Sequence, residues 1–299
     1  MKALNIGLIG AGAVGCFYAG HMARQGANVS IISRAPKDYS GPIEIVSKTD
    51  PFQFSPTAIY SLSDDVPSFD VLILATKVLP DLDPVQLIRP FVTKNTVILL
   101  IQNGVFIEAN LMAAFSNPII RSLAFVCAHR QSKMRIQHLD FGSITIGLMS
   151  GSIDVYHAHP FIQFLKKLPI KVHLSDNIQQ SIWEKLVWNA AFNPLSVYYK
   201  GLDTDALLNH EEAFYAIQAI MKEVQAGARI QNIDLSDQFL ADKITQTRKM
   251  MPYKTSMCLD YEQKRPLEID AILGNFIRFC RKHQVPTPIS QTIYTALKH

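Results

Sequence analysis

Residues 4–15 read LNIGLIGAGAVG, a short apolar run that passes directly into the pattern G-x-G-x-x-G. The apolar run suits a buried parallel strand, and the residues after it favour a helix that ends near Gly26. The run Val29–Ile32 then predicts a second strand. The glycine pattern therefore stands in the strand–helix–strand setting that a dinucleotide-binding fingerprint requires.

Each glycine of this pattern has a separate physical role. Gly10 permits the tight turn, Gly12 lets the backbone approach a pyrophosphate, and Gly15 lets the helix pack closely on the strand. The N-terminus of the helix then faces the phosphates, where its backbone N–H groups are unpaired. The predicted cofactor-binding loop consists of Gly10, Ala11, Gly12, Ala13, Val14 and Gly15.

The end of the second strand bears on the choice of cofactor. NAD-preferring sites place an acidic residue about 20 residues after the fingerprint to bind the ribose hydroxyls. Here the strand ends at Ser33–Arg34, and the first acid, Asp38, comes only after Pro36. Arg34 has the planar, bidentate donor set that grips a 2′-phosphate, although a solvated surface arginine is the alternative. We interpret the cofactor as NADP(H).

Two further buried strands end in polar residues. The strand Phe69–Ala75 leads to Lys77, and the strand Thr96–Ile101 leads to Gln102–Gly104. Ligands of open α/β sheets bind beyond the carboxyl ends of the strands, so Lys77 is placed to meet a ligand. Asn103 is either ordinary turn chemistry or a hydrogen-bonding group for the nicotinamide ribose or the substrate.

The remaining N-terminal segments complete a sheet. Strands are expected at 43–46, 57–60, 119–128, 134–138 and 143–146, with an antiparallel arrangement at the edge of the sheet. The pair His157 and His159 has no third ligand nearby, so we interpret it as the start of a surface helix and not as a metal site.

From about residue 175 the pattern changes to long helical segments, expected at 178–199, 204–231, 236–250 and 266–283. The chain is therefore predicted to be α/β with two domains. Residues 1–174 form a Rossmann-type dinucleotide-binding domain, and residues 175–299 form an all-α helical domain for substrate binding and catalysis.

The first of these helices contains WEKLVWNAAFNPLS at residues 183–196. Lys185, Asn189 and Asn193 recur at i, i+4 and i+8, so they share one face of the helix. The residues between them are mostly apolar, and buried polar groups need partners. This face is either a substrate wall with a proton donor, or part of a domain interface whose amides are satisfied by neighbouring backbone.

Composition excludes several classes of protein. Hydrophobic residues make up 48% and charged residues 18%, which supplies ample core. The net charge of +4 comes from scattered lysines and arginines, so no nucleic-acid partner is expected. The four cysteines form no C-x-x-C pair, and no run approaches the roughly 18 apolar residues of a membrane span. We expect a cytoplasmic protein with no structural metal and no membrane association.

Four patches in order give a family resemblance: Gly10–Gly15, Gln102–Gly104, Trp183–Leu195, and the segment from Thr255 to Asp270. The chain resembles the ketopantoate reductase (2-dehydropantoate 2-reductase) family, NADPH-dependent enzymes of pantothenate synthesis, over nearly its whole length. The first patch is shared by many dehydrogenases, whereas the last two are specific to this family.

The resemblance implies roles for single residues. Lys185 matches the catalytic lysine, and Glu268 matches an acid that lies by the cofactor ribose and the catalytic lysine. The implied substrate-binding residues are Asn103, Lys185, Asn189, Asn193 and Ser256. The implied cofactor contacts beyond the glycine loop are Arg34, Lys77, Asn103, Ala128 and Glu268.

The resemblance also implies a reaction, the reduction of 2-dehydropantoate to (R)-pantoate by hydride transfer, with Lys185 as general acid. The expected partner is a small 2-oxo acid, and the protein is expected to be a monomer or a homodimer. Two segments depart from the family pattern, 128–133 and Val78–Pro80. These departures leave the substrate open, so a reductase of another 2-oxo acid or an imine is one alternative. A non-catalytic NADP(H)-binding sensor is the other alternative.

Overall fold

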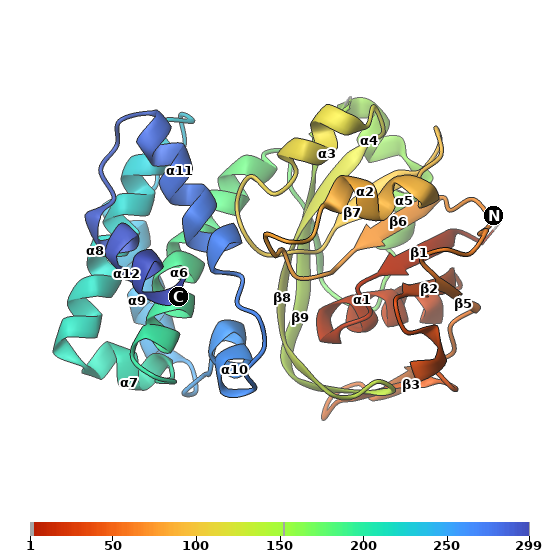
Figure 1. Ribbon diagram of the computed structural model, residues 1–299, viewed down its shortest axis with the longest axis horizontal. Helices are drawn as coiled ribbons and strands as arrows, with labels where there is room; N and C mark the ends of the chain where they lie inside the picture. The colour runs from red at the N-terminus through yellow and green to blue at the C-terminus, as the bar shows by residue number, and fades with distance from the viewer. Residues whose placement is uncertain (1–2, 152, 299) are drawn as a thin grey trace. The chain divides into compact units, whose positions relative to one another are not determined.

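The computed structural model describes residues 3–151 and 153–298, and it divides into two compact units (Figure 1). The first unit comprises Met1–Lys77, Asp83–Gln102 and Glu108–Ile178. The second comprises Val78–Leu82, Asn103–Ile107 and Gln179–His299. The main change of unit thus follows Ile178, and two short segments from the N-terminal half of the chain join the second unit. The functional domain limit between residues 174 and 175 stays a prediction.

The first unit is built on one mixed sheet. Its strands are β1 (Asn5–Ile9), β2 (Asn28–Ser33), β3 (Ile43–Val46), β4 (Phe52–Phe54), β5 (Ala58–Ser61), β6 (Val71–Leu74), β7 (Val97–Leu100), β8 (Ile119–Ser132), β9 (Arg135–Ser150) and β10 (Val172–Leu174). Their order is β4-β3-β9-β8-β7-β6-β1-β2-β5, and β10 pairs with β9 off this path. The strands β5, β2, β1, β6, β7 and β8 are parallel neighbours, which confirms the Rossmann-type prediction.

Alternating side chains along the central strands bury both faces of this sheet. Ile73 and Leu99 belong to one apolar cluster, and Leu74 and Leu100 belong to another. The first cluster includes side chains of α1 (Ala13–Arg24), α4 (Ile153–Ala158) and α5 (Pro160–Leu165). The second includes side chains of α2 (Pro84–Ile88), η2 (Arg89–Phe91) and α3 (Ala109–Ala114). Continuous apolar strands are the expected result of covering a parallel sheet on both faces.

The strands predicted at 134–138 and 143–146 are a single strand, β9, which forms a long antiparallel hairpin with β8. The antiparallel expectation is confirmed, but the edge position is wrong because β9 also pairs with β3 and β10. The apparent break at residues 139–142 is a bulge inside the strand. Phe141 and Gly142 adopt φ values of 62° and 127° there, and the pairing shifts register nearby.

The second unit contains the helices of the C-terminal part of the chain. They are α6 (Ile178–Tyr198), α7 (Thr204–Asn209), α8 (Glu211–Arg229), α9 (Asp237–Lys249), α10 (Ser256–Glu262), the π-turn η3 (Asp270–Gly274), α11 (Asn275–Lys282) and α12 (Pro288–Leu297). The all-α prediction is confirmed. Across residues 3–151 and 153–298, no helix is long and apolar enough to cross a membrane.

Two predicted helices differ from the structure in their limits. The segment 204–231 divides at His210, whose ring Nδ1 accepts a hydrogen bond from the backbone N of Ala213 at 3.4 Å and so caps α8. The segment 266–283 becomes helical only from Ile269, so Pro266 and Glu268 precede the helix. The spacing of apolar residues in the sequence did not predict either of these helix limits, because a cap and a π-turn depend on local hydrogen bonds.

Helix α6 is fixed within the second unit by its two tryptophans. The indole of Trp183 is fully buried, and its Nε1 donates to Gln231 Oε1 at 3.0 Å. The Nε1 of Trp188 donates to Thr247 Oγ1 on α9, also at 3.0 Å. Because a buried indole supplies both apolar area and one directed donor, these contacts fix the rotation of α6 about its axis.

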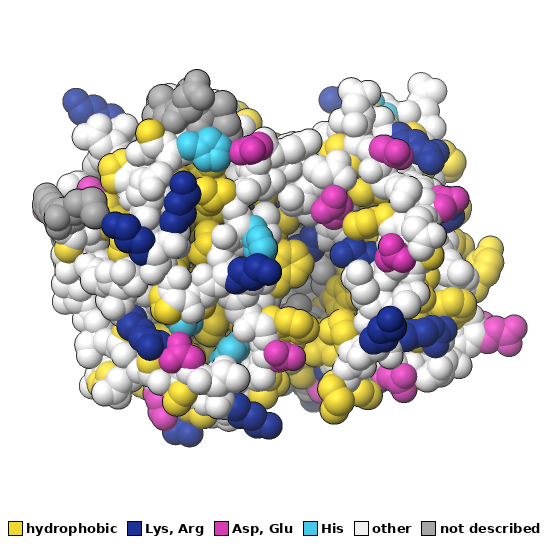
Figure 2. Space-filling model, turned by 180° about the vertical axis from the view of Figure 1, so that it is seen from behind, with side chains coloured by type: hydrophobic (Ala, Val, Ile, Leu, Met, Phe, Trp, Pro, Cys, Tyr) yellow, Lys and Arg dark blue, Asp and Glu magenta, His cyan; other side chains and the backbone are white. Residues whose placement is uncertain are grey.

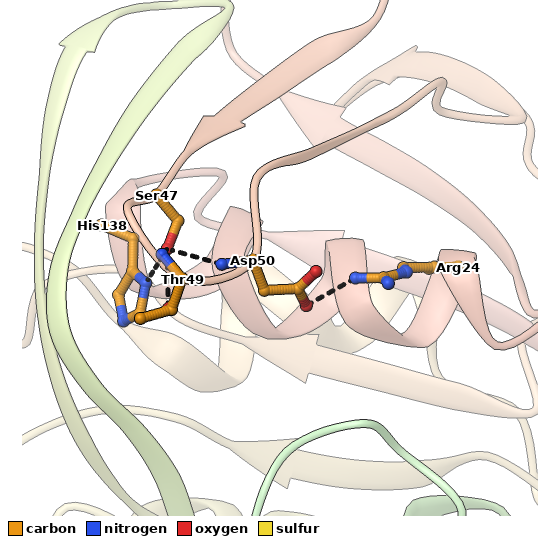
Figure 3. Close-up of polar contacts among 5 residues, drawn as sticks. All are labelled: Arg24, Ser47, Thr49, Asp50 and His138. Carbon is orange, nitrogen blue, oxygen red and sulfur yellow. Dashed lines mark hydrogen bonds and ion pairs between the residues drawn. The ribbon is translucent and has the colours of Figure 1, made fainter.

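The connection between β3 and β4 is attached to two elements of the first unit (Figure 3). Ser47 Oγ lies 3.0 Å from His138 Nδ1 on β9 and accepts hydrogen bonds from the backbone N of Thr49 and Asp50, both at 3.3 Å. Asp50 in turn pairs with Arg24 of α1 at 2.6 Å. Three charged or titratable members of this network, Arg24, Asp50 and His138, also act electrostatically on the buried His21.

His21 is 2% exposed and lies between two phenylalanine rings, with centroid distances of 4.7 Å to Phe17 and 4.6 Å to Phe52. Burial lowers the pKa of His21 to about 4. The Asp50 carboxylate acts in the opposite direction, whereas Arg24 and His138 lower the pKa further. The folded state therefore holds this imidazole in its neutral form.

We expect His21 to make the folded state less stable in acid. An unfolded histidine has a pKa of about 6.5, so the unfolded chain binds the proton more tightly between pH 6.5 and pH 4. The free energy of unfolding should fall by up to about 3 kcal/mol over that window. Urea unfolding of His21→Leu at about pH 7 and pH 4.5 should show a smaller loss than the wild type.

The exposed His173 of β10 supplies the control, since His173→Leu should leave the acid loss unchanged. Equal acid losses in His21→Leu and the wild type would contradict the prediction.

Candidate functional site

The predicted cofactor residues of the first unit gather at one edge of its sheet. β2, β1 and β6 are parallel neighbours, with Ile9 opposite both Ile32 and Leu74. Gly10 directly follows β1, Arg34 directly follows β2, and Lys77 comes three residues after β6. The structure thus brings the glycine loop, Arg34 and Lys77 to the same carboxyl edge, where ligands of such sheets bind.

The glycine loop has the shape that a pyrophosphate needs. Gly10 has a φ of 96°, and a Cβ there would lie 2.3 Å from the backbone N of Thr76, so the turn requires glycine. A Cβ on Gly12 would meet no atom within 4 Å. Gly12 is the N-cap of α1, whose first turn carries no acidic residue. This open space before a helix N-terminus fits a bound diphosphate.

The tip of β2 carries a basic residue and no available acid. Arg34 is exposed beside Ser33, whose hydroxyl accepts a hydrogen bond from the backbone N of Ala35 at 3.1 Å. The nearest following acid, Asp38, pairs with Lys133 at 2.9 Å. The strand end therefore presents an exposed arginine, and the nearest following acid is already paired with a lysine.

The catalytic candidates meet in the second unit. Lys185 is half-buried on α6, and its Nζ donates to Asn103 Oδ1 at 3.2 Å. Asn189 and Asn193 follow one and two helical turns later, with exposures of 9% and 3%. The structure therefore brings together Lys185 and Asn103, which are 82 residues apart in sequence, next to a row of buried amides.

Glu268 is held in a way that the sequence did not reveal. Its Oε1 accepts a hydrogen bond from the backbone N of Val78 at 2.9 Å, across 190 residues of sequence. Both residues belong to the second unit. Because Val78 directly follows Lys77, this bond fixes the position of the carboxylate relative to the chain just after the cofactor edge.

Ser256 is exposed at the first position of α10. The preceding residue, Thr255, caps this helix by accepting from the backbone N of Cys258 at 3.0 Å. The Oγ1 of Thr255 lies 2.8 Å from the Oγ of Ser196, which donates to the backbone O of Asn193 at 2.7 Å. Ser196 and Thr255 thus link α10 to α6 beside Asn193. A threonine at an N-cap was the only sequence signal for this link.

Two other predicted positions have different settings. Ala128 lies within β8 opposite His138, and not just after a strand end as Arg34 and Lys77 do. His159 caps α5 by accepting from the backbone N of Phe161 at 3.2 Å, and His157 pairs with Asp176 at 2.9 Å. In the described part of the chain, no three His, Cys, Asp or Glu side chains are placed to hold a metal ion.

The surface carries no concentrated charge of one sign on the face seen in Figure 2, where lysines and arginines alternate with acidic side chains. With a net charge of +4, the chain produces at most a weak field for small anions.

Comparisons with known proteins identify one family across both parts of the chain. The profile described as Ketopantoate reductase PanE/ApbA matches residues 6–151, and the profile for the C-terminal part of the same family matches residues 177–299. The 2-dehydropantoate 2-reductase of Nostoc sp. is 29% identical over 309 residues, covering 100% of this chain and 95% of that protein.

Solved structures agree with this result. The 2-dehydropantoate 2-reductase from Methylococcus capsulatus is 35% identical and has a TM-score of 0.87, covering 99% of this chain and 96% of that one. The ternary structure of D-mandelate dehydrogenase with NADH and anilino(oxo)acetate is 21% identical, with a TM-score of 0.86 and coverages of 98% and 96%, and shares the fold. The chain therefore belongs to the ketopantoate reductase family, whose members are dinucleotide-binding oxidoreductases.

Proposed function

We propose that this protein reduces 2-dehydropantoate to (R)-pantoate with NADPH, a reaction of pantothenate biosynthesis, and that Lys185 is the general acid. The observation that carries the proposal is the hydrogen bond from Lys185 Nζ to Asn103 Oδ1, on a helix face that also bears Asn189 and Asn193. An ammonium group held by an amide oxygen, next to further amides, matches the needs of a carbonyl reduction.

The glycine loop, Arg34 and Lys77 would hold NADPH, which would supply a hydride for the ketone carbon when bound. Negative charge then builds on the carbonyl oxygen, and a proton from Lys185 Nζ neutralises it as it forms. Asn103 directs the ammonium by accepting a hydrogen bond from Lys185 Nζ. The neutral amine regains its proton from solvent, which returns the site to its starting state.

The remaining polar residues of the second unit bind and orient the substrate. Asn189, Asn193 and Ser256 provide amide and hydroxyl groups for the carboxylate and the hydroxyl of 2-dehydropantoate. The hydrogen-bonded pair Ser196 and Thr255 keeps Ser256 at a fixed place relative to α6. Fixing the carbonyl in this way contributes to the rate by reducing the entropy that the reaction step must lose.

The proposed cofactor residues are the loop Gly10–Gly15, Arg34, Lys77, Asn103, Ala128 and Glu268. Open space at Gly12 accommodates the diphosphate, and Arg34 binds the 2′-phosphate. Asp38 is held by Lys133 and does not compete with that phosphate. These contacts favour NADPH over NADH.

We expect Arg34→Ala to weaken NADPH binding by about 10- to 100-fold and NADH binding by less than about threefold, because only NADPH carries the 2′-phosphate. Fluorescence titration of both cofactors measures the two dissociation constants. The exposed Lys94 supplies a control of equal charge change, since Lys94→Ala should alter neither constant. Equal losses for NADPH and NADH in Arg34→Ala would place recognition of the phosphate elsewhere.

The reaction itself is tested by the decay of NADPH absorbance with 2-dehydropantoate, run beside pyruvate and branched 2-oxo acids. Selective oxidation of NADPH with 2-dehydropantoate is the expected result. Turnover with another 2-oxo acid alone would keep the mechanism and replace the substrate. Binding of NADPH with no turnover on any substrate would leave a cofactor-binding sensor as the function.

A reductase of a different 2-oxo acid is the second candidate. Its support is the D-mandelate dehydrogenase relative, whose structure contains NADH and anilino(oxo)acetate. The segment 128–133, where the sequence departs from the family pattern, lies at the end of β8. Turnover of another 2-oxo acid, and none of 2-dehydropantoate, in the same substrate panel would favour this candidate over the first.

A further inference from the structure

The segment that carries Asn103 leaves the first unit and returns to it within a few residues. Gln102 and Glu108 belong to the first unit, whereas Asn103–Ile107 belong to the second. The segment Asn103–Ile107 is called the excursion below, and its first residue, Asn103, accepts the hydrogen bond from Lys185. The position of Asn103 depends on how the two ends of this excursion are held.

One buried side chain contacts both ends. Arg121 of β8 is 0% exposed, and its Nη1 donates to the backbone O of Gln102 at 3.0 Å. Its Nε lies 3.5 Å from Glu108 Oε2, and the Glu108 side chain is only 5% exposed. Burial lowers the pKa of Arg121, and the Glu108 carboxylate opposes this effect. The guanidinium therefore bridges the residue before the excursion and the residue after it.

Gln102, whose backbone is held by Arg121, is also hydrogen-bonded to a residue that follows β6. Its Nε2 donates to the backbone O of Thr76 at 2.7 Å and lies 3.1 Å from Thr76 Oγ1. Thr76 directly precedes Lys77 at the carboxyl end of β6. Arg121, Gln102 and Thr76 thus connect the ends of two strands that lead to predicted ligand-binding residues.

The middle of the excursion is held inside the second unit. The backbone N of Val105 donates to the backbone O of Ala271 at 3.1 Å, and Asn275 Nδ2 donates to the backbone O of Val105 at 2.8 Å. A Cβ on Gly104 would lie 2.7 Å from the same carbonyl of Ala271. Asn103 therefore lies between an end held by Arg121 and a segment docked on η3.

A buried ion pair is a poor source of stability, because desolvation offsets most of its attraction and an apolar pair of similar volume serves as well. The ion pair can instead orient its partners, because a guanidinium has its donors in a fixed plane and can hold two acceptors at set angles. The cost of burying Arg121 is thus better explained by positioning than by stability.

We propose that Arg121 is a positioning residue that fixes both ends of the Asn103–Ile107 segment and so keeps the Asn103 amide oxygen against Lys185 Nζ. The proposal rests on the proposed function of Lys185. Without Arg121, the segment gains freedom, and Asn103 no longer directs the ammonium towards the substrate oxygen. Small misplacements of this kind lower catalysis by up to about 100-fold without changing the reacting groups.

The test uses the double variant Arg121→Met with Glu108→Gln, which removes the guanidinium without leaving a buried unpaired carboxylate. Three quantities are measured beside thermal unfolding. The first two are kcat/KM for 2-dehydropantoate and the dissociation constant of NADPH. The third is hydrogen–deuterium exchange of the peptide that spans residues 101–108, which needs no turnover.

Ser122→Ala is the matched control. Ser122 is the next residue of β8, it is buried, and its Oγ donates to the backbone O of Leu100 at 2.8 Å. The control therefore removes a buried hydrogen bond from the same strand to β7 without touching either end of the excursion. It should lower thermal stability while leaving kcat/KM and the exchange of residues 101–108 unchanged.

We expect the double variant to exchange the 101–108 peptide about 10-fold faster than the control. Its kcat/KM should fall by about 10- to 100-fold, with NADPH affinity within about threefold of wild type, and Arg121→Lys should recover part of the loss. Exchange and kcat/KM equal to the control's would overturn the proposal. A wild type that turns over no substrate would refute the proposed function, and the exchange result would still decide whether Arg121 holds the segment.

Discussion

Replacing Lys185 with alanine should lower kcat by about 10²–10⁴-fold while the affinity for NADPH changes by less than about threefold. The loss falls on kcat because the proton is delivered as charge develops on the substrate oxygen, and not when the substrate binds. Single-turnover oxidation of NADPH in the presence of saturating 2-dehydropantoate measures the step directly.

The fold should survive this substitution. Lys185 is half-buried on α6, and alanine is a strong helix former. The hydrogen-bonded indoles of Trp183 and Trp188 hold the helix independently of the lysine. A lower rate in Lys185→Ala therefore reports on chemistry, provided that thermal unfolding remains close to wild type.

Two further variants distinguish the loss of the proton donor at residue 185 from the loss of a positive charge. Lys185→Arg keeps the positive charge but replaces the ammonium by a group that does not release its proton, so it should remain nearly as slow as Lys185→Ala. Lys222→Ala removes an exposed lysine that pairs with Asp237 at 2.5 Å, and it should keep full activity. Turnover of Lys185→Ala within a few-fold of wild type would remove Lys185 from the proposed role.

The parts of the fold that the sequence predicted are those that depend on local pattern. The apolar runs of β1, β6 and β7 are buried on both faces, so their composition alone distinguishes them from loops. The glycine fingerprint between β1 and α1 is also a local pattern. It predicted the parallel sheet because this motif between a strand and a helix is typical of dinucleotide-binding domains.

The parts that could not be predicted depend on contacts across long separations. The periodicity of α6 placed Lys185 on a polar face, yet nothing local indicates that Asn103 accepts its hydrogen bond. The bond from the backbone N of Val78 to Glu268 is equally invisible in sequence, because a backbone donor has no residue signature. Arg121 reads as an ordinary strand residue until its burial is known.

Replacing Gly12 with aspartate should lower NADPH affinity by at least about 100-fold while stability stays the same or rises slightly. Gly12 has a φ of −78° and a ψ of −169°, which an N-cap aspartate adopts without strain. Its Cβ would meet no atom within 4 Å, so the folded chain has room for the side chain. The carboxylate would then bond the free N–H groups of α1 and favour the helix.

The same carboxylate would occupy the place of the diphosphate and repel it, so stability and cofactor affinity should move in opposite directions. Gly41 gives a matched control, because it is exposed and a Cβ there also meets no atom within 4 Å. Gly41→Asp adds the same charge away from the fingerprint and should leave NADPH binding unchanged. Isothermal titration and thermal unfolding of both variants measure the two effects. If Gly12→Asp binds NADPH like Gly41→Asp, the diphosphate does not lie at the N-terminus of α1, and the cofactor assignment of this loop is wrong.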